Sequence, residues 1–246
     1  SQAIVPELLG SVGHVVDLAA DFRLTDAALY PQWYGEAHSA PDLLGAFAYG
    51  LPELFRPDIE AATHVAVPGC YPTASALALA PLVRAGMIEP DGIVVDAASG
   101  VSGAGRPPKP NTTFCTVDED FTAYGLLDHR HTPEIEQATG ASVIFTPHLV
   151  PMNRGILATC YARPTAPTST GALLDLMGSF YADEPFVVVG ESPPSTKAPL
   201  GSNTAHVTVR YDERTGWVLA LCAIDNLTKG ASGQAVQCAN LLLGLP

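Results

Sequence analysis

A junction between a buried strand and an apolar helix constrains the fold of this chain more than any other segment. Residues 64–67 have the pattern of a short buried strand, and residues 74–80 have that of an apolar helix. Pro68 and Gly69 interrupt the two patterns, and Pro72 fits the first turn of a helix, where its missing N–H costs nothing. A strand that leads directly into a helix is typical of a layered α/β fold.

Cys70 stands at this junction, which makes it a candidate nucleophile. The first N–H groups of a helix have no partner within the helix, and the helix dipole is positive there. Both effects lower the pKa of a thiol, so we expect a thiolate near neutral pH. The alternative is that Cys70 is a small buried hydrophobic residue, as many free cysteines are.

Composition narrows the class of protein. The chain has 246 residues, of which 47% are hydrophobic and 15% charged, so it can bury a sizeable core in one or two domains. A net charge of −13 argues against nucleic acid as a partner. We find no apolar run long enough for a membrane span and no signal segment. The five cysteines are scattered, which argues against a metal site or a disulfide framework. Such a set favours a reducing compartment and therefore predicts a cytoplasmic protein.

The order of the predicted elements divides the chain into two parts. Strands and helices alternate early, as in a parallel α/β layer, although residues 25–60 are rich in loops. Later segments are mostly strands, as in a largely antiparallel sheet. Strands are expected at 14–18, 92–98, 142–147, 156–163, 204–211 and 216–224, and helices from Thr132, at 171–182 and at 226–244. The fold class is therefore α/β followed by α+β, with the last helix packing back on the first part.

Two further segments carry candidate site residues. His129 and His131 flank Arg130 before a helix that we expect to have Thr132 as its N-cap and Pro133 at its first position. A neutral imidazole there could accept the thiol proton and later return it. Residues 99–106 follow a predicted strand and contain glycines, which let backbone N–H groups approach a ligand closely.

Several segments, taken together and in order, resemble those of one known family. They are Asp17–Leu24 (DLAADFRL), Tyr49–Leu54 (YGLPEL), Pro68–Thr73 (PGCYPT), Ser99–Arg106 (SGVSGAGR), His129–Ile135 (HRHTPEI), Arg154–Ile156 (RGI) and Asp225–Gly230 (DNLTKG). The chain resembles the N-acetyl-γ-glutamyl-phosphate reductases, relatives of the aspartate-semialdehyde dehydrogenases, from residue 14 to its end.

The resemblance implies a fold, a reaction and a cofactor. Residues 1–68 with 227–246 would be the remainder of a Rossmann-type NADP-binding domain. Residues 69–226 would be a catalytic and oligomerisation domain like the C-terminal domain of glyceraldehyde-phosphate dehydrogenase. The implied reaction is the NADPH-dependent reduction of an acyl phosphate to an aldehyde in arginine biosynthesis, through a thioester on a cysteine. The family's oligomers imply a homodimer or homotetramer.

The resemblance also implies roles for particular residues. Cys70 would be the nucleophile, His131 the favoured acid and base, and His129 the second choice. An arginine in a similar segment of the aspartate-semialdehyde enzymes suggests that Arg23 binds the acyl phosphate; the alternative is an ion-paired structural arginine. The remaining implied substrate contacts are Ser99, Arg106, Arg130, Arg154 and Glu134. The implied cofactor contacts are Ser99, Gly100, Ser102, Gly103 and Asn226.

The start of the chain lacks the glycine-rich strand–turn–helix that binds a dinucleotide pyrophosphate. We therefore expect roughly 80–90 residues, about half a dinucleotide fold, to be missing from this sequence. From this we expect residues 1–246 to bind NADPH poorly and to be inactive alone.

Three other functions remain open at this point. An aspartate-semialdehyde dehydrogenase would share the fold and the chemistry. A cysteine hydrolase would use Cys70 with a histidine and would need no nicotinamide. A binding or assembly module would have lost catalysis together with the cofactor lobe.

Overall fold

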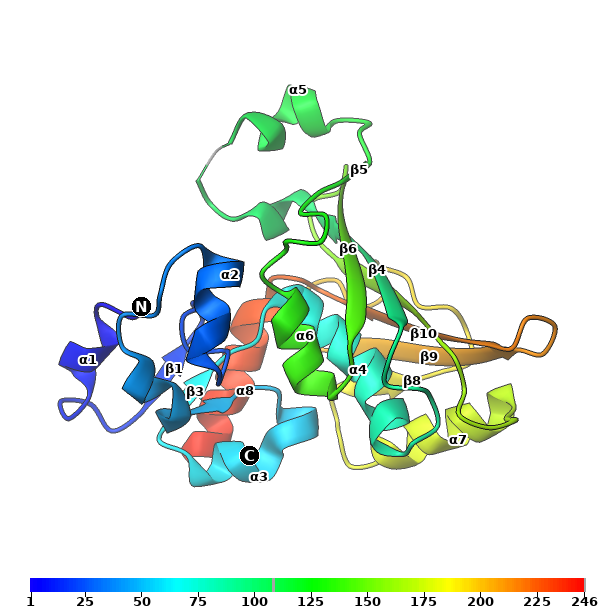
Figure 1. Ribbon diagram of the computed structural model, residues 1–246, viewed down its shortest axis with the longest axis horizontal. Coiled ribbons are helices and arrows are strands. Elements are labelled where there is room, and N and C mark those ends of the chain that lie inside the picture. Colours follow the sequence, from blue (N-terminus) through cyan, green and yellow to red (C-terminus); the bar gives the residue numbers. More distant parts are fainter. Residues whose placement is uncertain (108, 246) are drawn as a thin grey trace.

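The computed structural model describes residues 1–107 and 109–245, which form two β-sheets on either side of a buried helix, α4 (Cys70–Arg84) (Figure 1). Gly69 precedes α4 in an extended conformation, and Gly86 follows it with φ +64°. Alanine and leucine, both strong helix formers, dominate between these ends. Every residue from Tyr71 to Leu82 is buried, so α4 is a core helix that starts at the predicted nucleophile.

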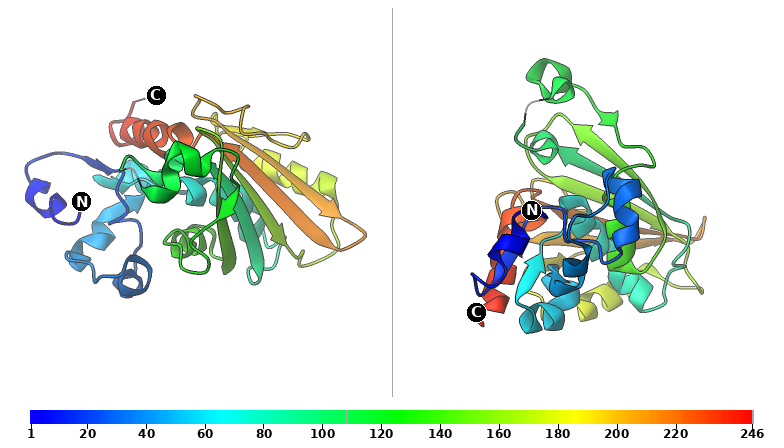
Figure 2. Two further views of the ribbon diagram at one scale, coloured as in Figure 1. Left: turned by 90° about the horizontal axis from the view of Figure 1, so that it is seen from above. Right: turned by 60° about the vertical axis from the view of Figure 1, so that its left-hand side comes forward.

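A small parallel sheet forms the N-terminal part. Its order is β1-β3-β2, with β1 at Val15–Asp17, β2 at Phe47–Tyr49 and β3 at His64–Ala66. Helices α3 (Pro52–Ala61) and α8 (Gly233–Leu242) contact this sheet, and Figure 2 shows α8 in red beside it. The short helices before β3 are α1 (Val5–Leu8), η1 (Ala27–Leu29), α2 (Tyr30–Tyr34) and η2 (Pro41–Ala46).

The last helix packs back on the first part, as predicted. Cys238 of α8 forms a small apolar cluster with Val65 of β3 and Ile59 of α3. A π-helical turn, η5 (Thr228–Ser232), precedes α8, where we predicted a single helix over residues 226–244. The turn matters because it lies against Cys70, as described below.

The second sheet is mixed and mostly antiparallel, with the order β5-β6-β4-β7-β10-β9-β8. Among the described strands of this sheet, only the pairs β4–β6 and β8–β9 are parallel. The strands are β4 (Ile93–Gly100), β5 (Thr122–Ala123), β6 (Val143–Val150), β7 (Ile156–Ala162), β8 (Val187–Val189), β9 (Ala205–Asp212) and β10 (Trp217–Ile224). Helices α4, α6 (Thr132–Thr139) and α7 (Thr170–Phe180) share the core with this sheet.

An arm, residues 101–107 and 109–130, projects from the end of β4 and returns to α6 (Figure 1). It contains η3 (Val101–Ala104), η4 (Pro110–Thr112), α5 (Phe114–Val117) and β5. Among the described residues, no helix combines the length and apolar character that crossing a bilayer requires.

We expect Leu77→Ala to lower the free energy of unfolding by about 2–5 kcal/mol, because the truncation leaves a cavity in the middle of α4. Urea denaturation measures the loss. Val236→Ala, on the exposed side of α8, is the matched control and should change stability by less than about 0.5 kcal/mol. Equal effects of the two substitutions would contradict the central position of α4 in the core.

Candidate functional site

Cys70 is the first residue of α4 and lines a pocket of about 620 Å³. The pocket lies between the β3–α4 junction, the arm and the segment before α6. Tyr71, Gly103, His129 and His131 line it with the cysteine. Cys70 is partly accessible, unlike Cys160, Cys222 and Cys238, which are buried. The structure therefore brings the predicted nucleophile and both predicted histidines to one cavity.

The imidazole of His131 packs against the residue before the nucleophile. A Cβ atom placed on Gly69 would lie 2.5 Å from Nε2 of His131, so only glycine leaves room for the ring. The helix begins one residue earlier than predicted, at Thr132, which makes His131 rather than Thr132 the N-cap. Nδ1 of His131 is buried and has no hydrogen-bond partner among the described residues, so no carboxylate there completes a triad.

His129 supports His131 through the backbone. The N–H of His131 donates to Nδ1 of His129 at 3.1 Å, and the ring centroids are 4.7 Å apart. Because Nδ1 accepts this bond, a neutral His129 carries its proton on Nε2. Burial, helped by the charge of Arg130, lowers the pKa of His129 to about 4. His129 is thus neutral at physiological pH.

The electrostatics differ from the sequence prediction for Cys70. Burial raises the pKa of its thiol to about 11, and the lowering effects of the Arg23 charge and the Tyr71 N–H are smaller. The predicted thiolate near neutral pH is therefore wrong for the unliganded site, because desolvation of the anion outweighs the helix terminus. Burial, together with the nearby charges of Arg23 and Arg130, lowers the pKa of His131 well below its ordinary value. The site holds a neutral thiol beside a neutral imidazole.

Glu134 fixes the backbone at the nucleophile from the first turn of α6. Its Oε1 accepts the N–H of Gly69 at 2.7 Å and the hydroxyl of Tyr49 at 3.0 Å. Arg23 Nη1 lies 3.6 Å from Oε2, and the Glu134 side chain is fully buried. Direct substrate binding by Glu134 stays a prediction, whereas its contacts with the protein are those of a support for the Cys70 junction.

Arg23 joins the small sheet to this support. Its Nε donates to the carbonyl oxygen of Val67 at 2.7 Å, and its Nη2 donates to that of Leu18 at 2.9 Å. The guanidinium is buried and ion-paired with Glu134, and it is not among the described residues that line the pocket. These contacts match the structural alternative, and phosphate binding by Arg23 stays a prediction.

The predicted cofactor contacts gather at the end of β4. Asn226 donates from Nδ2 to Ser102 Oγ at 3.0 Å and accepts the N–H of Gly155 on Oδ1 at 2.7 Å. Gly103 approaches this group closely, since a Cβ there would lie 2.6 Å from Ser99 Oγ. Gly100 is equally confined, because a Cβ atom placed on it would lie 2.7 Å from the backbone nitrogen of Arg154. The structure brings all five predicted residues together, and Gly103 opens onto the pocket.

The remaining predicted cations lie in different places. Arg130 is exposed and lines the pocket, whereas Arg106 is exposed on the arm and is not among the described lining residues. Arg154 pairs with Asp225 at 3.1 Å and donates to Thr228, so it braces the turn before α8.

The lining residues that sequence reasoning missed include Trp33, Lys109 and Tyr124. Tyr124 donates its hydroxyl proton to the hydroxyl oxygen of Tyr71 at 3.2 Å, at the base of the arm. Lys109 adds a second cation beside Arg130. No local pattern marks any of the three, because only the path of the arm and of α2 brings them to the pocket. The described residues contain no group of three His, Cys, Asp or Glu side chains that could hold a metal ion.

Comparison with known proteins identifies the family of this chain. Residues 70–226 match the family model of the semialdehyde dehydrogenase dimerisation domain. Over 256 residues the chain is 52% identical to an N-acetyl-gamma-glutamyl-phosphate reductase of Symbiobacterium thermophilum, covering 100% of this chain and 73% of that protein. The N-acetyl-gamma-glutamyl-phosphate reductase of Magnetococcus marinus is 51% identical, and the match covers 99% of this chain and 72% of that protein. The chain belongs to the N-acetyl-gamma-glutamyl-phosphate reductase family.

Solved structures confirm the predicted fold class. Aspartate semialdehyde dehydrogenase II from Vibrio cholerae superposes with a TM-score of 0.75 at 20% identity, over 99% of this chain and 76% of that one. A probable aspartate-semialdehyde dehydrogenase from Pseudomonas aeruginosa gives a TM-score of 0.68 at 18% identity, over 98% and 76% of the two chains. At these identities the likeness concerns the fold alone.

We expect the rate of Cys70 alkylation by iodoacetamide to rise about tenfold per pH unit between pH 7 and pH 10. The thiolate is the reactive form, and its fraction grows in this way when the thiol pKa is about 11. Mass spectrometry of the peptide that contains Cys70 separates its reaction from that of the exposed Cys115. A plateau reached below pH 8 would show that the helix terminus outweighs burial.

Proposed function

We propose that this protein reduces N-acetyl-γ-glutamyl phosphate to N-acetylglutamate semialdehyde with NADPH, through a thioester on Cys70, in arginine biosynthesis. The observation that carries the proposal is the accessible Cys70 at the start of α4, in one pocket with the buried, neutral His131. The names of the relatives at about half identity supply the substrate class. A cytoplasmic location, and a catalytic domain over residues 69–226, stay predictions.

The neutral pair fits the first half of this reaction. As Sγ of Cys70 attacks the acyl carbon, the thiol loses its proton to His131, and a C–S bond forms while the C–O bond to phosphate breaks. A neutral thiol with a raised pKa needs such a base, and an imidazole with a lowered pKa has a free lone pair for the proton. In the second half the C–S bond breaks as the aldehyde is released, and the proton held by His131 returns to Sγ of Cys70. We propose His129 as the support that orients this base.

NADPH would supply the hydride that converts the thioester to the aldehyde. The chain fits the nicotinamide end, because Gly103 leaves backbone open to the pocket and lies beside Ser99 and Asn226. A pyrophosphate usually rests on a glycine-rich turn between a strand and a helix, and the described residues contain no such turn. We therefore propose that residues 1–246 alone bind NADPH weakly.

The pocket's cations are the candidates for the anionic ends of the substrate. Arg130 lines the pocket from the segment between the two histidines, and Lys109 lines it from the arm. We propose that these two residues, rather than the ion-paired Arg23, make the first contact with the substrate's carboxylate or phosphate.

In the full-length enzyme, Cys70→Ser should reduce the phosphate-dependent oxidation of N-acetylglutamate semialdehyde by NADP⁺ at least about 10³-fold, since the thioester can no longer form. Cys115→Ser, an exposed cysteine on the arm, is the control and should retain the activity. Aspartate semialdehyde, tested in parallel, should be a poor substrate. Retained activity in Cys70→Ser would end the covalent mechanism, and preference for aspartate semialdehyde would reassign the substrate.

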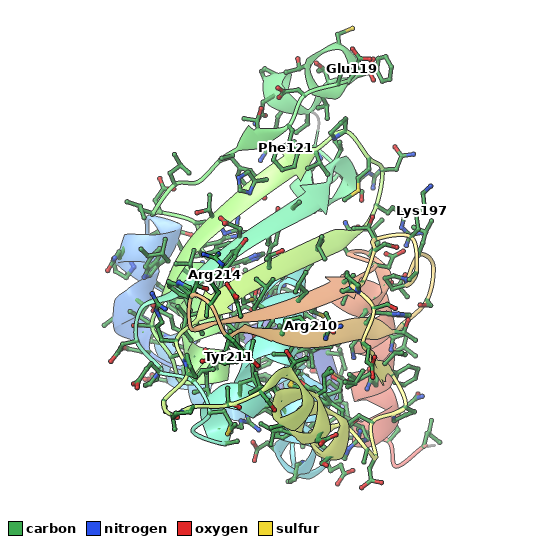
Figure 3. All side chains as sticks on the ribbon, turned by 90° about the vertical axis from the view of Figure 1, so that its right-hand side faces the viewer. Glu119, Phe121, Lys197, Arg210, Tyr211 and Arg214 are labelled. Carbon is green, nitrogen blue, oxygen red and sulfur yellow. The ribbon has the colours of Figure 1, made fainter. Side chains whose placement is uncertain are left out.

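We further propose that the protein forms a homodimer through the open face of the large sheet. The strand residues alternate between a buried face against the helices and a partly exposed face. In register, Ile144, Val94, Tyr161, Leu219 and Arg210 cross this second face on five neighbouring strands. Figure 3 looks toward this sheet with its strands in front. A mostly apolar row of this length on an uncovered sheet is typical of an interface, and the matched family model is a dimerisation domain.

Tyr161→Lys should convert the dimer to a monomer, because it places a cation in the middle of that face. Sedimentation velocity measures the change. Val236→Lys, on the exposed side of α8, which contacts the small sheet, is the control and should leave the dimer intact. A Tyr161→Lys variant that sediments as the wild type does would place the interface elsewhere.

A further inference from the structure

A fully buried lysine lies next to the site, and the proposed chemistry does not use it. Lys229 belongs to the π-helical turn η5, and its Nζ lies 2.5 Å from Glu53 Oε1 on α3 and 2.9 Å from Gln237 Oε1 on α8. Gln237 Nε2 also donates to Glu53 Oε1, at 2.9 Å. We call Lys229, Glu53 and Gln237 the lysine cluster. It ties η5 to two helices of the N-terminal part.

A buried ion pair needs an explanation other than stability. Moving both charges out of water costs about as much as their attraction returns, so apolar residues of similar volume would serve a core as well or better. Burial raises the pKa of Glu53, but the charge of Lys229 and the hydrogen bonds from Lys229 and Gln237 lower it further, so Glu53 is ionised. Glu53 Oε2 has no hydrogen-bond partner among the described residues. Such a pair instead holds the two segments that carry it, here η5 and α3, in one defined arrangement.

The geometry it defines includes the position of Cys70. Gly230, the residue after Lys229, packs directly on the nucleophile: a Cβ on Gly230 would lie 2.7 Å from Cys70 Cβ and 3.2 Å from its Cα. The N–H of Gly230 donates to the carbonyl oxygen of Asp225, five residues earlier, which is π-helical bonding. Such turns are rare and occur frequently at functional sites. Relaxation to α-helical bonding would change the position of Gly230 relative to Cys70.

We propose that the lysine cluster is a positioning device, which holds η5 in its π-helical register so that Gly230 sets the place of Cys70 beside His131. Lys229 and Glu53 are thus positioning residues, which act through the turn and do not touch the substrate. The proposal rests on the proposed function only in taking Cys70 as the nucleophile. Its direct consequence, an altered reactivity of the Cys70 thiol, can be measured without substrate or NADPH.

The test removes the pair while keeping its volume. Lys229→Met alone would leave Glu53 charged and buried, so the variant is Lys229→Met/Glu53→Met, with both charges removed. Lys197→Met, an exposed lysine labelled in Figure 3, is the control. The readouts are urea denaturation, the pH profile of Cys70 alkylation by iodoacetamide, and kcat and KM for semialdehyde oxidation by the full-length enzyme.

We expect the double variant to unfold at the wild-type urea concentration, to show a shifted alkylation profile, and to lose about 10- to 100-fold in kcat with KM within twofold. A small displacement of a reacting group has costs of this size. A folded double variant with the wild-type alkylation profile and kcat would overturn the proposal. Cys70→Ser with full activity would instead refute the proposed function, so the two failures are distinguishable.

Gly230→Ala provides a second test that does not depend on the pair. The added methyl group presses on Cys70, so the alkylation profile should shift, whereas Gly190→Ala, where a Cβ meets open space, should leave it unchanged. If the double variant does not fold, Gly230→Ala still tests whether η5 sets the position of the Cys70 thiol. An unchanged profile in folded Gly230→Ala would show that the turn does not set the position of the thiol.

Discussion

The site depends on one buried hydrogen bond, from the N–H of Gly69 to the carboxylate of Glu134. It fixes the residue before Cys70 to the first turn of α6, and His131 immediately precedes that turn. The nucleophile and its base therefore stand in a fixed relation, although they come from segments about sixty residues apart in the sequence. Arg23, paired with the same carboxylate, extends the connection to the small sheet. One acidic side chain of α6 thus connects the Cys70 junction and the small sheet.

The close packing that creates this relation also sets the charge state of the site. Glycine at positions 69 and 230 lets His131 and η5 approach from two sides, and the resulting exclusion of water raises the thiol pKa and lowers the imidazole pKa. A resting thiolate would be open to oxidation and alkylation. A neutral pair becomes nucleophilic only when the base takes the proton during attack. The resting thiol is therefore unreactive, and it becomes a nucleophile only through proton transfer to His131 during the reaction.

The sequence allowed the main elements to be predicted, because they depend on local patterns, and it marked Cys70 and the two histidines that the structure brings to one pocket. The strand–turn–helix around Cys70 and most of the large sheet follow from apolar periodicity and punctuation by proline and glycine. Helix α3 and strand β2 fell in a segment expected to be loop, since Pro52 and Pro57 obscure the helical pattern there. The thiol pKa, the role of Glu134 and the lysine cluster were out of reach, because they depend on contacts between distant segments.

The central claim is that Cys70 takes the acyl group from the substrate, with His131 as its base. Mass spectrometry of the protein after incubation with N-acetyl-γ-glutamyl phosphate, without NADPH, tests it most directly. The account predicts one N-acetylglutamyl group on the peptide containing Cys70, one phosphate released per acyl group, and loss of the modification when hydroxylamine is added. An unmodified Cys70 peptide, with the acyl phosphate consumed or intact, would contradict the account.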